Sequence, residues 1–137
     1  MKREIKFRVW DHNTDTMMIP DNFEFYDGKI GWIDAGREAG PESGNDGYPD
    51  QFEIMQYTGL HDKNGREIYE GDIVDIGLEN QDGKLVLAPV IYGEYIAGYV
   101  LDNGGNGIWQ RLTEDCEVIG NIFEDGGLID GKGSATN

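Results

Sequence analysis

The sequence predicts a mainly β protein: a small barrel or sandwich of short antiparallel strands, with an N-terminal β-hairpin section and little helix. Three observations lead to this prediction. Glycine-containing turn signals recur roughly every eight to twelve residues, a spacing typical of all-β folds. Apolar and polar residues alternate in the short segments between these turns. Long stretches without glycine and proline occur only at the start and over 108–119, which leaves little room for helices.

The N-terminal β-hairpin section is expected over 1–34. Its first strand, Met1–Trp10, shows the clearest alternation, with an apolar face formed by Ile5, Phe7 and Val9 and a charged face formed by Glu4, Lys6 and Arg8. Charges on such a strand are typical of an edge strand that avoids aggregation. The alternative is a contact surface, whose candidate residues are Lys2, Lys6, Arg8 and Trp10.

Two hairpins complete this section. A polar turn leads to a return strand at Met17–Ile19, which Pro20 closes. The strands Phe23–Tyr26 and Ile30–Ile33 then flank Asp27-Gly28-Lys29, a hairpin signal. The next segment, Ala35–Asp50, is rich in glycine and has almost no apolar residue besides Tyr48, so it is expected to be a flexible loop.

A barrel-like domain is expected over 51–125. After a strand that starts near Phe52, the run Tyr57–Val74 reads as strand, tight Asn64-Gly65 hairpin, strand, Gly71-Asp72 corner and strand. Further strands are expected at 85–92, with Pro89 at an edge or bulge, at 95–101 and at 117–123. A turn is expected over 102–107, one short helical turn is allowed near 113–115, and a flexible tail is expected over 126–137.

Composition limits the partners. The net charge is −16; the first eight residues carry four basic and one acidic side chain (+3), and the remainder carries 7 basic and 26 acidic (−19). This acidity disfavours direct nucleic-acid binding and favours basic partners, although it also serves solubility. The sequence shows no secretory signal and no membrane span, and Cys116 is the only cysteine. We therefore expect a cytoplasmic protein with a reduced core thiol and no membrane partner.

No reactive constellation is recognisable, and neither a metal nor another cofactor is predicted. The histidines His12 and His61 are expected in turns, and Cys116 stands between two acids that would raise its pKa. Asp72 and Asp75, three residues apart on a strand, would point to opposite faces, so Asp72 is interpreted as a turn residue that accepts main-chain hydrogen bonds. The turns Gly104–Gly107 and Asp62–Gly65 match calcium loops poorly.

Aromatic residues leave two interpretations open. Tyr57, Tyr69 and Trp10 could form a binding patch. In a glycine-rich β chain, however, such residues more often supply the core, because they carry most of the area that can be buried. Core is the interpretation we expect.

Three segments resemble the YopX family, small proteins encoded by phages and prophages. They are Arg3–Asp11, Tyr57–Val74 and Glu117–Glu124, in this order. The resemblance implies a mainly β fold with a small barrel and a capacity for self-association, and it implies no catalytic residue. The signature residues, interpreted as structural, are Tyr57, Thr58, Gly59, Leu60, Asn64, Gly65, Tyr69, Gly71 and Asp72.

The leading hypothesis is therefore a non-enzymatic phage or prophage accessory protein. It would act through protein–protein contact, as a homo-oligomer or with a basic host or phage protein, in the cytoplasm of the host cell. The alternative is an acidic decoy that mimics DNA and occupies a host nucleic-acid-binding protein. A nucleic-acid binder that uses the basic first strand is weaker, and a hydrolase or metal enzyme comes last.

Overall fold

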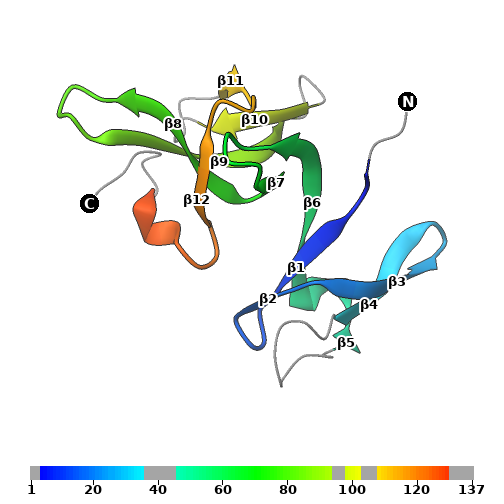
Figure 1. The fold of residues 1–137 in the computed structure, drawn as a ribbon. Helices are drawn as coiled ribbons and strands as arrows, with labels where there is room; N and C mark the ends of the chain where they lie inside the picture. Colours follow the sequence, from blue (N-terminus) through cyan, green and yellow to red (C-terminus); the bar gives the residue numbers. More distant parts are fainter. Residues whose placement is uncertain (1–3, 36–45, 94–97, 103–107, 130–137) are drawn as a thin grey trace. The chain divides into compact units, whose positions relative to one another are not determined.

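The computed structural model describes residues 4–35, 46–93, 98–102 and 108–129 (Figure 1). The regular structure of these residues consists of antiparallel β-strands and short 3-10 turns, which confirms the predicted mainly β fold. The chain divides into two compact units, an N-terminal unit of residues 5–56 and a C-terminal unit formed mainly by residues 57–137. None of the described helical segments is long and apolar enough to cross a membrane.

The N-terminal unit contains two small sheets. In the first, β1 lies between β2 and the first half of β6; in the second, the order is β3-β4-β5. The elements are β1 (Phe7–Asp11), β2 (Thr16–Met18), β3 (Pro20–Tyr26), β4 (Lys29–Ala35), β5 (Asp46–Gly47), the 3-10 turn η2 (Pro49–Gln51) and β6 (Phe52–His61). The core of this unit is formed by Val9, Met18, Ile33 and Phe52, against which Phe23, Ile30 and Ile54 pack.

Strand β1 is an interior strand, so its interpretation as an edge strand is wrong. Val9 pairs with Met18 on one side and with Ile54 on the other. The predicted alternation also fails at both ends of the segment, because Val9, Trp10 and Asp11 are all buried whereas Ile5 is 61% exposed. A strand that has neighbours on both sides and is covered at its C-terminal end buries consecutive residues rather than every second one.

The β3–β4 hairpin forms as predicted. Tyr26 pairs with Lys29, and the two residues between them, Asp27 and Gly28, have φ angles of 54° and 79°. Positive φ at both central positions is what a primed two-residue turn requires, and Asp and Gly tolerate it best.

The predicted loop 35–50 is shorter than expected at its C-terminal end. Residues 36–45 lie outside the described residues. Strand β5 then pairs with β4, placing Gly47 opposite Ile33, and Tyr48 packs its ring on that of Trp32. The loop was predicted to be flexible because its own residues bury little apolar surface. The prediction did not consider that the edge of strand β4 offers main-chain hydrogen-bond partners to β5.

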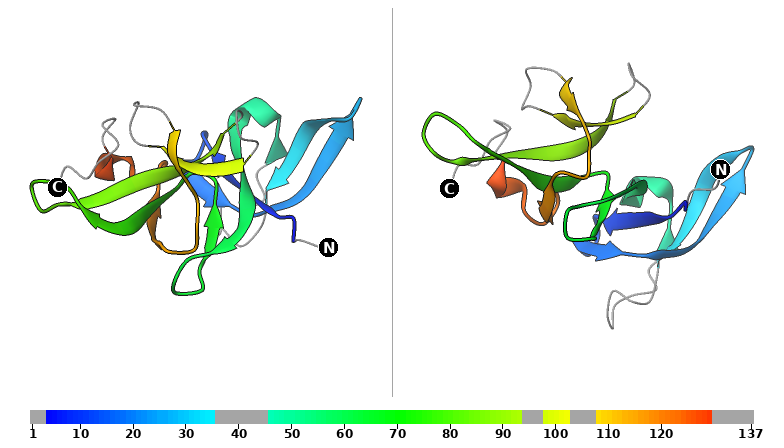
Figure 2. Two further views of the ribbon diagram at one scale, coloured as in Figure 1. Left: turned by 90° about the horizontal axis from the view of Figure 1, so that it is seen from above. Right: turned by 45° about the horizontal axis from the view of Figure 1, so that its top comes forward.

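The C-terminal unit contains a curled antiparallel sheet with strand order β11-β10-β9-β8-β12, together with the second half of β6, which pairs with β7 outside that sheet. Figure 2 shows β8 and β9 as a long, curved ribbon. The elements are β7 (Glu67–Tyr69), β8 (Asp72–Glu79), β9 (Leu85–Gly93), β10 (Gly98–Asp102), β11 (Ile108–Arg111), β12 (Glu117–Asn121) and the 3-10 turn η4 (Gly126–Leu128). Its core is formed by Ile68, Val74, Ala88, Val90, Leu101, Leu112, Cys116 and Val118.

Several details of this unit differ from expectation. Pro89 is buried in the interior strand β9, opposite Ile73 of β8, and not at an edge or bulge. The pairing of β9 with β10 ends at Val90, so Pro89 lies one residue beyond that ladder and need not donate a hydrogen bond to β10. No helical turn forms at 113–115. Residues 103–107 of the predicted turn 102–107, residues 95–97 of the predicted strand and residues 130–137 of the predicted tail lie outside the described residues. The 3-10 turn η4 orders the start of that tail.

Candidate interaction site

The signature segment forms a bulged hairpin between β6 and β7. The rings of Tyr57 and Tyr69 face each other across the two strands, with centroids 5.5 Å apart. The Thr58 hydroxyl donates a hydrogen bond to the main-chain oxygen of Ile68 at 2.7 Å. Gly59 has a φ of 91°, and the register shifts between Tyr57 and His61. These residues therefore shape a bend in the strand, a structural role.

The hairpin turn is wider than the predicted two-residue turn, and that prediction is corrected here. His61 pairs with Glu67, so five residues, Asp62–Arg66, form the loop. Gly65 alone among them has a positive φ, 84°, and its N–H donates to the Asp62 carbonyl at 2.9 Å. This is a type I turn followed by a left-handed glycine, a common alternative to the primed turn.

The Asp62 carboxylate organises this loop. Its Oδ1 accepts the N–H groups of Asn64 and Arg66, both at 2.9 Å, and its Oδ2 accepts the N–H of Val118 at 2.8 Å. Burial acts to raise the pKa of Asp62, but these three hydrogen bonds, assisted by the positive charge of Arg66, lower it below its ordinary value. The buried carboxylate is thus held ionised and joins the β6–β7 loop to β12.

The corner at Gly71 and Asp72 confirms the turn interpretation. Gly71 has a φ of 85°, and its N–H donates to Val90 O at 2.8 Å while its carbonyl accepts the Ile122 N–H at 2.8 Å. Oδ2 of Asp72 accepts the N–H of Tyr69 at 2.8 Å. Gly71 therefore ties the corner to both β9 and the segment that follows β12.

The two histidines belong to different units of the described structure. His12 lies in the N-terminal unit, 3.2 Å from a Glu53 carboxylate oxygen, whereas His61 ends β6 beside Tyr57 in the C-terminal unit. Among the described residues, no group of three or more His, Cys, Asp or Glu side chains could hold a metal ion.

Cys116 is a buried free thiol, as predicted. Burial, together with the charges of Asp62, Asp115 and Asp72, raises its pKa to about 11. The prediction recognised Asp115 as a cause; Asp62 and Asp72 are distant in the sequence and could be placed beside the thiol only by the fold.

The surface predicted on the first strand is only partly exposed. Trp10 is 7% exposed and belongs to the core, so it cannot be a contact residue. The core interpretation also holds for Tyr57, which is buried. Lys6 and Arg8 are half-buried, and Lys2 lies outside the described residues.

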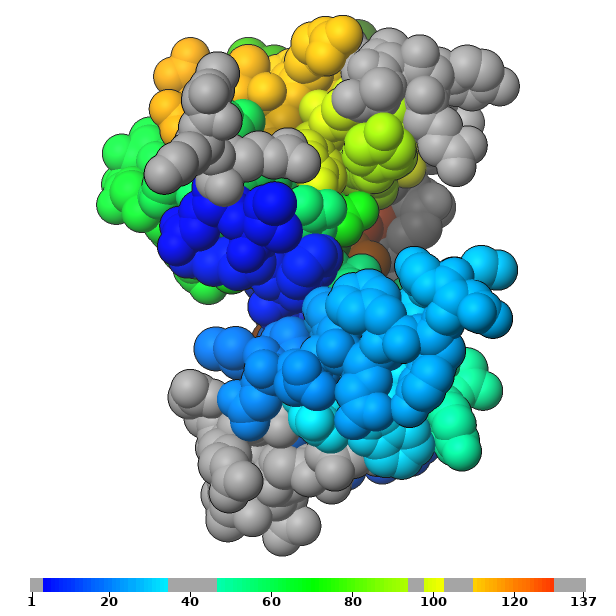
Figure 3. Space-filling view, turned by 90° about the vertical axis from the view of Figure 1, so that its right-hand side faces the viewer, coloured from blue at the N-terminus to red at the C-terminus, as the bar shows by residue number. Residues whose placement is uncertain are grey.

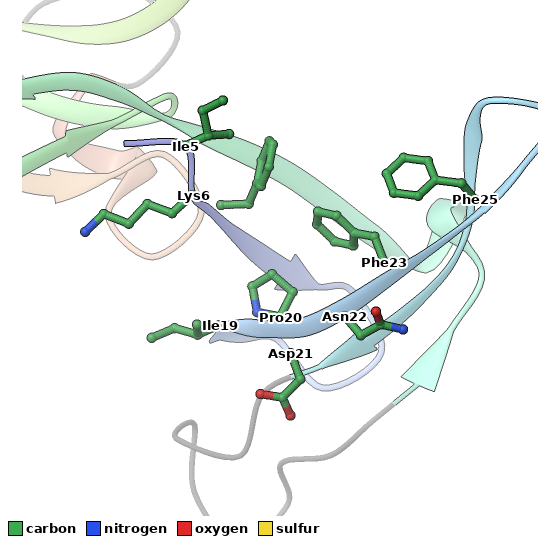
Figure 4. A pocket seen from close by; sticks show the side chains of 9 residues that line it. Ile5, Lys6, Ile19, Pro20, Asp21, Asn22, Phe23 and Phe25 are labelled. Atoms are coloured by element: carbon green, nitrogen blue, oxygen red, sulfur yellow. The ribbon is translucent and has the colours of Figure 1, made fainter. Parts of the chain in front are cut away.

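An open apolar groove lies instead between the start of β1 and strand β3 (Figure 4). Its volume is about 400 Å³, and its lining residues are Ile5, Lys6, Phe7, Ile19, Pro20, Asp21, Asn22, Phe23 and Phe25. The rings of Phe7 and Phe23 meet edge to face, with centroids 5.3 Å apart. In Figure 4 the side chains of Lys6 and Asp21 point away from the ring of Phe23, so these two polar groups lie at the rim.

The groove exposes large apolar side chains. Phe25 is 61% exposed, and Ile5 and Ile19 are also exposed. Sequence reasoning assigned Ile5 to the buried face and did not consider the surface of β3. The alternation of Phe23 and Phe25 on one side of a short strand was the available signal, because such residues need a covering partner.

Comparison with known proteins agrees with this fold. The YopX protein family model matches residues 6–130. The structure is similar to the crystal structure of protein EF1440 from Enterococcus faecalis, with a TM-score of 0.67 and 26% sequence identity over 93% of this chain and 99% of that one. No curated protein matches the sequence. The family match covers most of the chain and contains two of the three segments whole and most of the third, so the chain belongs to the YopX family.

Proposed function

We propose that this chain is a non-enzymatic accessory protein, encoded by a phage or prophage, that acts in the host cytoplasm through protein–protein contact. The apolar groove between β1 and β3 is the contact surface. The observation that carries the proposal is the exposure of Phe25, Ile5 and Ile19 around the groove. Exposed apolar clusters of this kind typically mark a surface that a partner covers.

The chemistry of the groove favours a protein partner over a small-molecule substrate. Its lining includes the Phe7–Phe23 ring pair, and the polar side chains of Lys6 and Asp21 point away from Phe23, at the rim. A ligand pocket usually encloses its ligand and directs several polar groups at it. An apolar centre with a polar rim is instead the arrangement of a protein interface.

Self-association is the first mode of contact to test. The basic residues Lys6 and Arg8 at the start of β1 and the acids Asp21 and Glu24 of β3 have opposite charges, which favours pairing between copies. Size-exclusion chromatography with light scattering at low and high salt measures the mass. We expect an oligomer in low salt, and a monomer at both salt concentrations would contradict self-association.

The variant Phe25→Ser tests the groove itself. It removes an exposed aromatic side chain from the rim of the groove and should lower the measured mass to that of a monomer. The matched control is Leu85→Ser, which removes an exposed apolar side chain at the start of β9 and should leave the mass unchanged. If both variants keep the wild-type mass in low salt, the groove is not the contact between copies.

The acidic decoy remains a second candidate because exposed carboxylates are spread over both units. The described exposed acids include Asp15, Asp21, Glu24, Asp27, Asp50, Glu53, Glu79, Asp82, Glu114, Asp115 and Glu124. A decoy should recover DNA-binding proteins from host lysate, and moderate salt should release them. Recovery of none would remove this candidate.

A further inference from the structure

A second surface of the N-terminal unit combines aromatic rings with carboxylates. Glu24 pairs with Trp32 and Asn22 pairs with Asp34 across β3 and β4, so these side chains share one face of the sheet. Tyr48 follows β5 and reaches the same face through its contact with Trp32. We call this surface the aromatic–acidic face; its residues are Asn22, Glu24, Tyr26, Trp32, Asp34 and Tyr48.

The rings of this face are held in place but remain open to solvent. The centroids of Trp32 and Tyr48 are 5.0 Å apart, and the rings are nearly perpendicular at 86°. The Tyr26 ring lies against the backbone of Gly31, where a Cβ atom would overlap it. Tyr48 is nevertheless 66% exposed and Tyr26 60% exposed. The strands β3 and β4, light blue in Figure 3, lie at the surface in that view.

The carboxylates of this face are fixed by neutral donors. The Tyr26 hydroxyl donates to Glu24 Oε1 at 2.9 Å, and the Trp32 indole N–H donates to Asp34 Oδ1 at 3.1 Å. Within the described part of the chain, neither Glu24 nor Asp34 forms an ion pair with a lysine or arginine. The hydrogen bond to Glu24 and the charge of Glu24 raise the pKa of Tyr26, which agrees with a negative potential at this face.

We propose that the aromatic–acidic face binds a cationic side chain, preferably arginine, of a basic protein segment. The inference rests on the proposed function in protein–protein contact, but its β3 residues lie on the face of that strand opposite Phe23 and Phe25, and it shares only Asn22 with the groove lining. Open tyrosine faces attract cations, and an adjacent carboxylate completes the charge match. Arginine fits best because its planar guanidinium stacks on a ring and also binds a carboxylate with two hydrogen bonds.

Charge complementarity selects this class of partner. The face has the negative charges of Glu24 and Asp34, and the exposed Asp21 and Asp27 lie on or next to β3; Lys29 is the one described basic residue of the β3–β4 hairpin. Nucleic acids and anionic membrane surfaces present negative charge and would be repelled. A polypeptide segment with arginine or lysine supplies the required cation.

The test uses the full chain labelled with nitrogen-15 and observes the indole N–H signals of its tryptophans by NMR. The probe is a short glycine–arginine repeat peptide, and the control peptide has citrulline, a neutral isostere, in place of arginine. We expect the arginine peptide to shift the Trp32 signal, assigned with Trp32→Phe, and the citrulline peptide to leave it unchanged. A Trp32 signal that the arginine peptide does not move would overturn the proposal.

Variants separate this site from general acidity. Tyr48→Leu removes one ring without changing charge, and Glu24→Gln removes one exposed carboxylate; each should weaken peptide binding about fivefold. Glu79→Gln makes an equal change of charge at an exposed residue of β8. It should change the dissociation constant of the peptide less than about threefold. Equal weakening by Glu24→Gln and Glu79→Gln, or none by Tyr48→Leu, would refute a local site.

The groove and the aromatic–acidic face can be tested independently of each other. Phe25→Ser alters the groove and should leave binding of the arginine peptide unchanged. If that variant stays oligomeric while the peptide still binds, the groove proposal fails and the aromatic–acidic face stands. If Phe25→Ser instead loses peptide binding while its NMR spectrum shows that it is folded like the wild type, the groove and the aromatic–acidic face are parts of one surface.

Discussion

Oδ2 of Asp62 accepts a hydrogen bond from the main-chain N–H of Val118 at 2.8 Å, although the two residues are 56 positions apart. The same carboxylate closes its own loop through Oδ1. A second loop repeats the local part of this arrangement: Oδ1 of Asn80 accepts the N–H groups of Asp82 at 2.8 Å and Lys84 at 3.1 Å. The difference is that Asp62 uses both of its oxygens as acceptors, which an asparagine cannot do.

This pair of loops gives the first prediction. Asp62→Asn replaces one carboxylate oxygen with an NH₂ group. If this group takes the place of Oδ2, two donors face each other and the buried N–H of Val118 loses its acceptor. We expect the free energy of unfolding to fall by about 2 kcal/mol. Asn80→Asp is the matched control and should change it by less than about 0.5 kcal/mol. Urea unfolding followed by tryptophan fluorescence measures both, and equal effects would contradict the role given to Oδ2.

The lowered pKa of Asp62 predicts how this contribution depends on pH. A carboxyl group whose folded-state pKa lies below its unfolded value of 3.8 stabilises the fold above that value. The contribution is lost as the pH falls through the lower, folded pKa. The stability difference between wild type and Asp62→Asn should therefore be constant near neutral pH and shrink below about pH 4. A difference that grew as the pH fell would contradict the sign of the shift.

The chemistry of Cys116 gives a third prediction. Raising the pKa from 9.0 to about 11 lowers the thiolate fraction at neutral pH about a hundredfold, and burial further restricts access. Iodoacetamide should therefore alkylate the folded protein far more slowly than the urea-unfolded protein, as mass spectrometry can follow. Equal rates in the two states would show that the thiol is accessible, contrary to its position in the core.

Gly71 provides the fourth prediction because its left-handed backbone makes main-chain hydrogen bonds in two directions. Gly71→Ala would force a side chain into a conformation with φ of 85° and should cost about 1–2 kcal/mol of unfolding free energy. Gly126→Ala is the control, since a Cβ there meets no atom within 4 Å and the backbone is not left-handed. Thermal unfolding of both variants measures the difference, and a stable Gly71→Ala would contradict the strain expected at this corner.

The sequence predicted local features well because their causes are local. The Asp27-Gly28-Lys29 hairpin signal identified the β3–β4 hairpin, in which Asp27 and Gly28 adopt the positive φ that these residue types tolerate. The corner at Gly71 and Asp72 was predictable for the same reason.

Features that depend on distant partners could not be predicted in this way. Asp62 looked like a turn residue, and only the position of β12 shows that its carboxylate is buried against Val118. Ile5 is exposed rather than buried because it borders an open groove, whereas Trp10 is buried, as the core interpretation predicted, in a strand that has neighbours on both sides. The aromatic–acidic face arises from pairing of β3, β4 and β5, which a single-strand pattern does not contain.

If the groove beside β3 is a contact surface, another protein covers it in the cell. Benzoylphenylalanine can replace Phe25, and in a control protein Leu85, and irradiation of cells then joins that position to whatever covers it. We expect a covalent adduct, with another copy or with a second protein, from position 25 and none from position 85. Absence of an adduct at position 25, or the same adducts from both positions, would contradict it.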